Sequence, residues 1–232
     1  MAVTLDKSEV IKRCSNLQKY WQPRTNKLKD WYKLIQMIDE LKQEKMESFV
    51  GNDPQSSFKL LRHMLDQKIP HRIPHEQLTI EMAFVASDIS ILYDTAWNDI
   101  FTRYRKRGRQ GWVWDLAGYL LATGWYSVFA MITQDGSRCI AEVLNPATVY
   151  PSWDDDLVEC ARIDTLSPIS AQRMITRNNW SMNAPRGSIK RYDYWRLDEN
   201  GQVWNSIVLG TTLVKPDTYE QRFSRIPIFT AP

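Results

Sequence analysis

The sequence predicts an α+β protein in which N-terminal helices, one of them long, precede antiparallel β hairpins. Three observations support this fold class. Apolar residues recur every three or four positions in the first half, a spacing typical of amphipathic helices. Aromatic and β-branched runs flank Asp135-Gly136 and again residues 198–201, and such paired runs predict hairpins. We therefore expect a helical region over residues 1–124 and an antiparallel β-rich region with one short helix over residues 125–232.

The first helix signals lie before residue 66. Trp31, Leu34 and Leu41 belong to an apolar stripe with charged residues on the opposite side, which predicts an amphipathic helix. The sequence then breaks at Gly51-Asn-Asp-Pro54. Asp53 is suited to cap the next helix through its carboxylate, and Pro54 is suited to the first helical position because proline lacks the N–H that would be unpaired there.

A much longer helix is predicted from about residue 76 to residue 107. Thirty residues of helix span roughly 45 Å at 1.5 Å per residue, which is long for a compact domain of this size. We expect such a helix to pack along its whole length, either within the chain or across a subunit interface. The residues at three- and four-residue spacing are Ala83, Ala86, Ser90, Tyr93, Trp97, Ile100 and Tyr104. A further apolar helix is expected over 112–123, with Gly124 as its left-handed C-cap.

The second half has the pattern of strands. The expected strands are 125–132 and 138–144 around the Asp-Gly turn, 158–166, and 189–197 and 203–209 as a second hairpin, with a short helix over 170–177. The end of the sequence, 224–232, is apolar and strand-like without a polar tail. We expect the native chain to continue beyond Pro232.

Composition excludes several classes of protein. The 232 residues carry a formal net charge of +3, too small an excess to mark the whole chain as nucleic-acid-binding. The three cysteines, Cys14, Cys139 and Cys160, are scattered and odd in number. We therefore expect neither a disulfide framework nor a zinc site, and we expect the protein to occupy a reducing compartment. There is no secretory signal, and the apolar runs are too short to cross a bilayer. We expect a soluble protein with no membrane partner.

Motifs for catalysis or cofactor binding are missing from the sequence. It has no nucleotide-cradling glycine loop, zinc-protease helix or nucleophile elbow. We predict no catalytic residue, no cofactor and no metal site. His71 and His75 are four residues apart, but the prolines beside them disfavour a helix. We therefore expect this segment to be a connecting loop and not a metal site. The run Asp154-Asp155-Asp156 has two interpretations: a solvated turn, which we favour, or Mg²⁺ ligands of a nucleic-acid enzyme.

One short stretch is strongly basic. Its members are Arg103, Arg105, Lys106, Arg107 and Arg109, at the end of the long predicted helix. Cations at a helix C-terminus are stabilised by the helix dipole. That effect accounts for one or two of these cations but not for five, which also repel one another. A negatively charged partner is therefore expected, either phosphate or an acidic face of a neighbouring subunit.

Several strings resemble segments of the portal proteins of tailed bacteriophages. Residues 48–58 (SFVGNDPQSSF) resemble that family's entry to a helix. Residues 107–112 and 115–128, the latter containing Thr123-Gly-Trp125, are similar to its helix–Gly-Trp–strand passage. Residues 142–156 (EVLNPATVYPSWDDD) and 225–232 (RIPIFTAP) are similar to its later segments. The four strings follow the family's order from about residue 48 to the end.

The resemblance implies a non-enzymatic structural protein of the virion. Portal subunits form a homo-oligomeric ring, commonly a dodecamer, at one capsid vertex, through which double-stranded DNA is packaged and ejected. Implied partners are other copies of the chain, the terminase large subunit, the major capsid protein, adaptor or tail proteins, and DNA that passes without sequence-specific contact. The implied location is the capsid portal vertex, and the host cytoplasm during assembly. By this resemblance, the chain is expected to correspond to the N-terminal part of such a protein, mainly its wing region.

Two alternatives stay open: a nucleic-acid-binding adaptor that forms no ring, and a metal-dependent nucleic-acid enzyme that uses residues 154–156. The wing lies mostly away from the channel in the family. For the basic stretch we therefore rank ion pairs between subunits first, solvation of a helix end second, and direct DNA contact third. Charge reversal at Arg105 and Arg107 is expected to impair ring assembly more than DNA binding.

Overall fold

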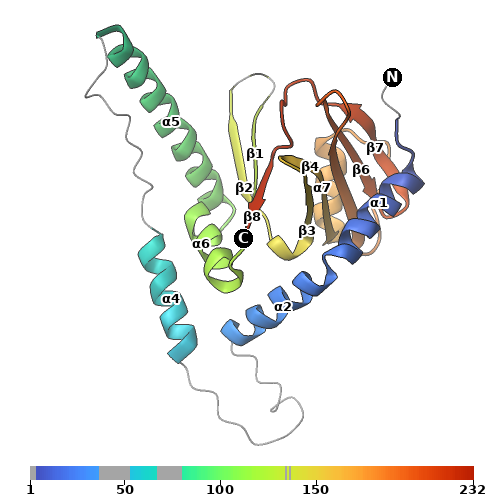
Figure 1. Ribbon diagram of the computed structural model, residues 1–232, viewed down its shortest axis with the longest axis horizontal. Coiled ribbons are helices and arrows are strands. Elements are labelled where there is room, and N and C mark those ends of the chain that lie inside the picture. The colour runs from blue at the N-terminus through green and yellow to red at the C-terminus, as the bar shows by residue number, and fades with distance from the viewer. Residues whose placement is uncertain (1–3, 37–52, 67–79, 134, 136) are drawn as a thin grey trace, which may run out of the picture. The chain divides into compact units, whose positions relative to one another are not determined.

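The computed structural model describes residues 4–36, 53–66, 80–133, 135 and 137–232. Helices come first and antiparallel strands follow, so the predicted α+β class is confirmed (Figure 1). The strands form one five-stranded and one three-stranded sheet. In chain order the elements are α1 (Lys7–Tyr20), α2 (Gln22–Gln36), α4 (Asp53–Leu65), α5 (Ile80–Lys106), α6 (Trp112–Thr123), β1 (Tyr126–Ile132), β2 (Cys139–Val143), the 3₁₀ helix η1 (Pro146–Thr148), β3 (Val149–Trp153), β4 (Leu157–Leu166), α7 (Pro168–Arg177), β5 (Ile189–Leu197), β6 (Val203–Leu209), β7 (Thr212–Tyr219) and β8 (Ile228–Ala231).

The chain divides into two compact units. The sheet unit contains Met1–Asp30 and Leu144–Ala231, and the helical unit contains Trp31–Val143. The β1–β2 hairpin therefore belongs to the helical unit, whereas α1 belongs to the sheet unit. The units do not coincide with the regions 1–124 and 125–232, because α1 buries its apolar side on strands that follow it by more than a hundred residues.

The sheet unit is built on five antiparallel strands in the order β3-β4-β5-β6-β7. The predicted β5–β6 hairpin is confirmed: Leu197 pairs with Val203, and Gly201 has the positive φ of 70° that favours glycine. α1 contacts all five strands. Its Val10 and Cys14 are fully buried in a cluster with Tyr194, and burial raises the pKa of the Cys14 thiol.

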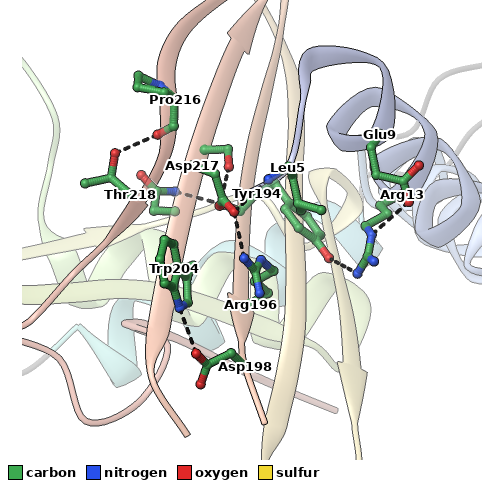
Figure 2. Close-up of polar contacts among 12 residues, drawn as sticks. Leu5, Glu9, Arg13, Tyr194, Arg196, Asp198, Trp204, Pro216, Asp217 and Thr218 are labelled. Atoms are coloured by element: carbon green, nitrogen blue, oxygen red, sulfur yellow. Dashed lines mark hydrogen bonds and ion pairs between the residues drawn. The ribbon is translucent and has the colours of Figure 1, made fainter. Parts of the chain in front are cut away.

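A buried polar network joins the N-terminal segment to this sheet (Figure 2). The carboxylate of Asp217 accepts hydrogen bonds from Arg196 Nη2 at 2.7 Å, from the Leu5 backbone N–H at 3.1 Å, and from Ser206 Oγ at 2.8 Å. The Asp217 side chain is 0% exposed. Because three donors surround the carboxylate, the buried charge is compensated, and residue 5 is held beside β7.

The outer edge of the sheet at β3 is covered by two side chains, Trp21 between α1 and α2 and Arg24 in the first turn of α2. Trp21 Nε1 donates to the Pro151 carbonyl at 2.6 Å, and Arg24 Nη2 donates to the Val149 carbonyl at 2.5 Å. Pro151 itself lacks an N–H, as is usual on an edge strand. The carbonyls of Val149 and Pro151 are thus occupied, which protects this part of the edge from pairing with another strand.

The helical unit places α6 and the β1–β2 hairpin against the second half of α5. The hairpin is confirmed, with Val128 opposite Val143 and Ile132 opposite Cys139. α6 also ends as predicted, because Gly124 takes a left-handed conformation with φ of 64°. The core between these elements consists of Ile100, Tyr104, Trp112, Val113, Val128 and Val143.

Other sequence expectations have mixed outcomes. The long helix is confirmed as α5, from residue 80 to 106, and the short helix as α7. α4 begins at Asp53, one residue before Pro54, which was the predicted first helical position. The predicted stripe at residues 31–41 is described only up to the end of α2 at Gln36. α1, β3 and β7 were not predicted.

Candidate assembly surface

Three of the five residues in the basic stretch bind groups of their own unit. Arg103 pairs with Asp99 at 2.6 Å and also donates to the Cys139 carbonyl of β2. Arg107 pairs with Glu142 of β2 at 2.8 Å. These contacts attach the end of α5 to the hairpin.

The third of these residues, Arg109, faces α6. It pairs with Asp115 at 3.4 Å, and its guanidinium lies 5.4 Å from the centre of the Tyr104 ring. Tyr104 is itself buried, and its hydroxyl oxygen accepts a hydrogen bond from the Val143 N–H at 2.9 Å. Burial raises the pKa of Tyr104. The turn between α5 and α6 is therefore fixed to the helical unit by a charge pair and an aromatic contact.

Arg105 and Lys106 are the remaining two cations of the stretch, and both are exposed. Neither takes part in an ion pair with the described residues of the chain. Within the described residues, the stretch therefore leaves two cations rather than five without an ion pair. No local pattern signals the contacts with Cys139 and Glu142, which lie more than thirty residues away. The Asp99–Arg103 pair is different: its four-residue spacing is a recognisable ion-pair pattern on a helix, and the sequence interpretation missed it.

α4 is attached to α6 through one arginine. Arg62 Nε donates to the Trp114 carbonyl at 2.7 Å, and its guanidinium lies 4.3 Å from the centre of the Trp114 ring. It also pairs with Asp115 at 3.6 Å. Burial lowers the pKa of Arg62 and raises that of Asp115. Arg62 can lie this close to α6 because Gly118 has no side chain: a Cβ there would be 2.6 Å from the arginine Cζ.

We expect Gly118→Ala to displace the Arg62 guanidinium and to loosen α4. The lost hydrogen bond and cation–π contact should reduce the free energy of unfolding by about 1–2 kcal/mol. Arg62→Ala should have a similar effect, and the double variant should cost little more than either single one, because both remove the same contact. Denaturant unfolding measures these energies. Gly187→Ala is the matched control, since the space around Gly187 is open. If the stability losses of Gly118→Ala and Arg62→Ala add up in the double variant, the two residues do not share the contact described here.

The first half of α5 exposes large apolar side chains. At 100° per residue, these side chains and the buried Ala86 cover an arc of roughly 220° around the helix axis, and Ser87, Ser90 and Asp94 lie in the remaining sector. The apolar stripe of a helix that packs on one side is typically about 100° wide, so an arc as wide as this one is normally buried from more than one direction. The second half is different: it buries Ile100 and Tyr104 and presents polar residues outward. The exposed residues of the first half are Phe84 (70%), Val85 (58%), Ile89 (48%), Ile91 (61%), Leu92 (69%) and Tyr93 (51%).

α4 also presents an apolar face that its own unit does not cover. Leu60, Leu61, Met64 and Leu65 are each about half exposed or more. They form two ridges, Leu60–Met64 and Leu61–Leu65, with the four-residue spacing along which helices pack. We call the exposed residues of α5 and of α4 together the apolar surface of the helical unit. Groups of exposed large apolar side chains such as these mark interaction sites.

The candidate metal ligands are not brought together. Asp154, Asp155 and Asp156 form an exposed turn between β3 and β4, in which the Asp154 N–H donates to the Asp156 carbonyl at 2.9 Å. In the described part of the chain, no group of three or more His, Cys, Asp or Glu residues is arranged to hold a metal ion. His71 and His75 lie outside the described residues. All three cysteines are free thiols.

No helix among the described residues is long and apolar enough to cross a membrane. Comparison with protein-family models finds no match to this chain, and comparison with curated proteins finds no match either.

Proposed function

We propose that this chain is a structural subunit of a ring of identical copies, corresponding to the wing region of a tailed-bacteriophage portal protein. In this role the chain has no catalytic task. Its mechanism is geometric: neighbouring copies pack side against side until the ring closes. Double-stranded DNA passes through the ring and meets it through phosphates alone, without readout of base sequence.

The observation that carries the proposal is the apolar surface of α5. A single partner covers one side of a helix, but the apolar side chains in the first half of α5 extend over roughly 220° of its circumference, so they require cover from more than one direction. A closed ring gives every subunit two neighbours, one on each side. A soluble monomer with these side chains in water would instead expose a large apolar area and tend to aggregate.

Two of the segments that resemble portal proteins form the kind of secondary structure that the resemblance implies, and this supports the proposal. The Gly-Trp string joins the end of α6 to β1 through Gly124 and Trp125, which is the helix–turn–strand passage expected from the resemblance. Residues 142–156 run through β2, η1 and β3. Both segments therefore have a structural role in this chain.

The basic stretch is more consistent with a role in a ring subunit than with a dedicated DNA-binding site. Three of its cations are used within the helical unit, which leaves Arg105 and Lys106 for other contacts. Two free cations are few for nucleic-acid affinity, because binding strength and its salt dependence scale with the number of phosphates neutralised. The terminase large subunit, the major capsid protein and the adaptor or tail proteins are the further partners of the proposed portal.

We expect the purified chain to assemble in solution as protein concentration rises. Sedimentation velocity over a hundredfold range of concentration should show monomer giving way to one large species, because a ring closes at a fixed number of copies. A chain that stays monomeric over the whole range would contradict the proposal. A continuous series of growing oligomers would contradict ring closure.

A further inference from the structure

We propose that Arg105 and Lys106 of one copy bind a group of exposed aromatic rings with an acidic border on the sheet unit of the next copy. The inference rests on the proposed function, since it names a charged contact by which neighbouring copies of the ring meet. The contact joins two different faces of the chain, and contacts of that kind can close into a ring. We call the second face the aromatic–acidic surface; its residues are Tyr20, Trp21, Trp153 and the turn 154–156.

Three aromatic rings gather where α1 and β3 end. The Trp21 ring meets both of its neighbours edge to face: its centroid lies 5.3 Å from that of Tyr20 and 6.0 Å from that of Trp153. Tyr20 is 75% exposed and Trp153 is 40% exposed, so two of the three rings are open to a partner. Groups of exposed aromatic residues mark interaction sites, because such residues are enriched in protein interfaces.

The chemistry of this surface favours a cationic partner. Tryptophan and tyrosine rings attract guanidinium and ammonium groups, and Trp21 already holds one from its own chain: Arg24 Cζ lies 4.5 Å from the ring centre. Trp153 is followed directly by the turn 154–156, the longest run of acidic residues in the sequence, and all three aspartates are exposed. None of them forms an ion pair with the described residues of the chain. Aromatic rings beside carboxylates suit an arginine or lysine side chain.

The same chain supplies such cations on a different unit. Arg105 and Lys106 are adjacent, exposed and without an ion pair among the described residues. At 100° per residue their side chains point about 100° and 200° away from Tyr104, which is buried in the core of the helical unit. They therefore project outward from the last turn of α5. Because the most basic stretch and the longest acidic run occur in one sequence, complementary charge indicates a second copy as the partner.

This contact gives the assembly a direction that apolar burial alone does not give. Arg105 and Lys106 end the same helix whose first half exposes the apolar residues described above. Burial of apolar side chains drives association without directional preference, whereas charges decide which faces meet. Two copies that met through their basic stretches, or through their acidic turns, would bring like charges together, and such contacts are disfavoured.

Charge reversal tests the contact from both sides. One variant carries Arg105→Glu and Lys106→Glu, and a second carries Asp154→Lys and Asp155→Lys. Each should raise the protein concentration at half assembly by roughly tenfold, the change expected when two exposed ion pairs are lost. Added salt should weaken assembly of the wild type more than that of either variant, because salt screens exposed charges.

Two further variants separate this contact from general effects of charge and test the aromatic part. Lys27→Glu combined with Lys29→Glu reverses two exposed cations of α2 and should leave the concentration at half assembly within about twofold of the wild type. Tyr20→Ala removes a ring that is 75% exposed, so the sheet unit should stay folded. It should raise the concentration at half assembly by roughly threefold through the lost cation–π contact.

Recombining the reversed charges shows whether the contact lies between copies. The variant with all four reversals should assemble within about twofold of the wild type, because opposite charges again face each other. An equal mixture of the basic-stretch variant and the acidic-turn variant should also assemble. When these two alternate around a ring, reversed meets reversed at half of the contacts and unchanged meets unchanged at the other half. Native mass spectrometry should then find rings in which both variants are equally represented.

The outcomes that would overturn the inference differ from one another. If the fourfold variant recovers but the mixture does not, the two charged groups pair within one chain. If only the basic-stretch variant is impaired, the cations bind elsewhere, and if only the acidic-turn variant is impaired, the turn has another partner. If both variants assemble like the α2 control, the ring forms without this contact. A wild-type chain that forms no ring overturns the proposed function itself.

Discussion

Replacing Asp217 by alanine is expected to reduce the free energy of unfolding by about 3–5 kcal/mol, the usual result of removing one partner from a buried ion pair. The Arg196 guanidinium would lose its carboxylate while it remains about 10% exposed, and the Leu5 N–H would lose its acceptor. Since whole domains are stable by only about 5–15 kcal/mol, the sheet unit would be close to unfolding. Chemical denaturation followed by tryptophan fluorescence measures the change.

Two further variants test whether the loss at Asp217 comes from the buried ion pair. Asp217→Leu combined with Arg196→Met removes both charges, and it should recover much of the lost stability, because no buried charge is then left alone. Asp155→Ala removes an exposed carboxylate from the β3–β4 turn and should change stability by less than about 0.5 kcal/mol. If Asp217→Ala behaves like Asp155→Ala, the network in Figure 2 does not hold the N-terminal segment to the sheet.

Replacing Leu92 by glutamate is expected to abolish assembly while the subunit stays folded. Leu92 is 69% exposed in the single chain, so a carboxylate there remains in water as long as the chain is alone. In the assembly the same carboxylate would be buried without a partner, which costs several kcal/mol at every contact. We expect the concentration at half assembly to rise at least hundredfold by sedimentation velocity, with an unchanged circular dichroism spectrum.

The control for Leu92→Glu lies on the same helix. Asn98 is exposed on the second half of α5, where the outward residues are polar. Asn98→Glu introduces the same charge outside the apolar surface and should leave assembly within about twofold of the wild type. Equal effects of the two substitutions would show that added charge, and not burial of α5, controls assembly.

Local sequence patterns predicted the elements whose signals are local. The α6 helix and its Gly124 cap, both hairpins and the long α5 follow directly from periodicity and turn chemistry. α1 also carried a readable signal, since Asp6 accepts a hydrogen bond from the Glu9 N–H, an N-cap arrangement that precedes a helical spacing of apolar residues. β7 was hidden by Lys215-Pro216-Asp217, residues that disfavour strands but are tolerated at a sheet edge.

Contacts between distant residues were beyond these patterns. The basic stretch was recognised as a cluster, but its division into three internally bound cations and two exposed ones depends on how β2 and α6 pack beside α5. The apolar surface of α5 is a similar case. Its spacing predicted a helix that packs along its whole length, yet only the structure distinguishes the covered second half from the exposed first half.

Electron microscopy of the purified wild-type chain, at a concentration where sedimentation shows assembly, tests the central claim most directly. The proposal predicts closed rings with a central channel and one dominant number of subunits around the axis. Monomers, two-fold dimers without a channel, or open filaments would contradict it.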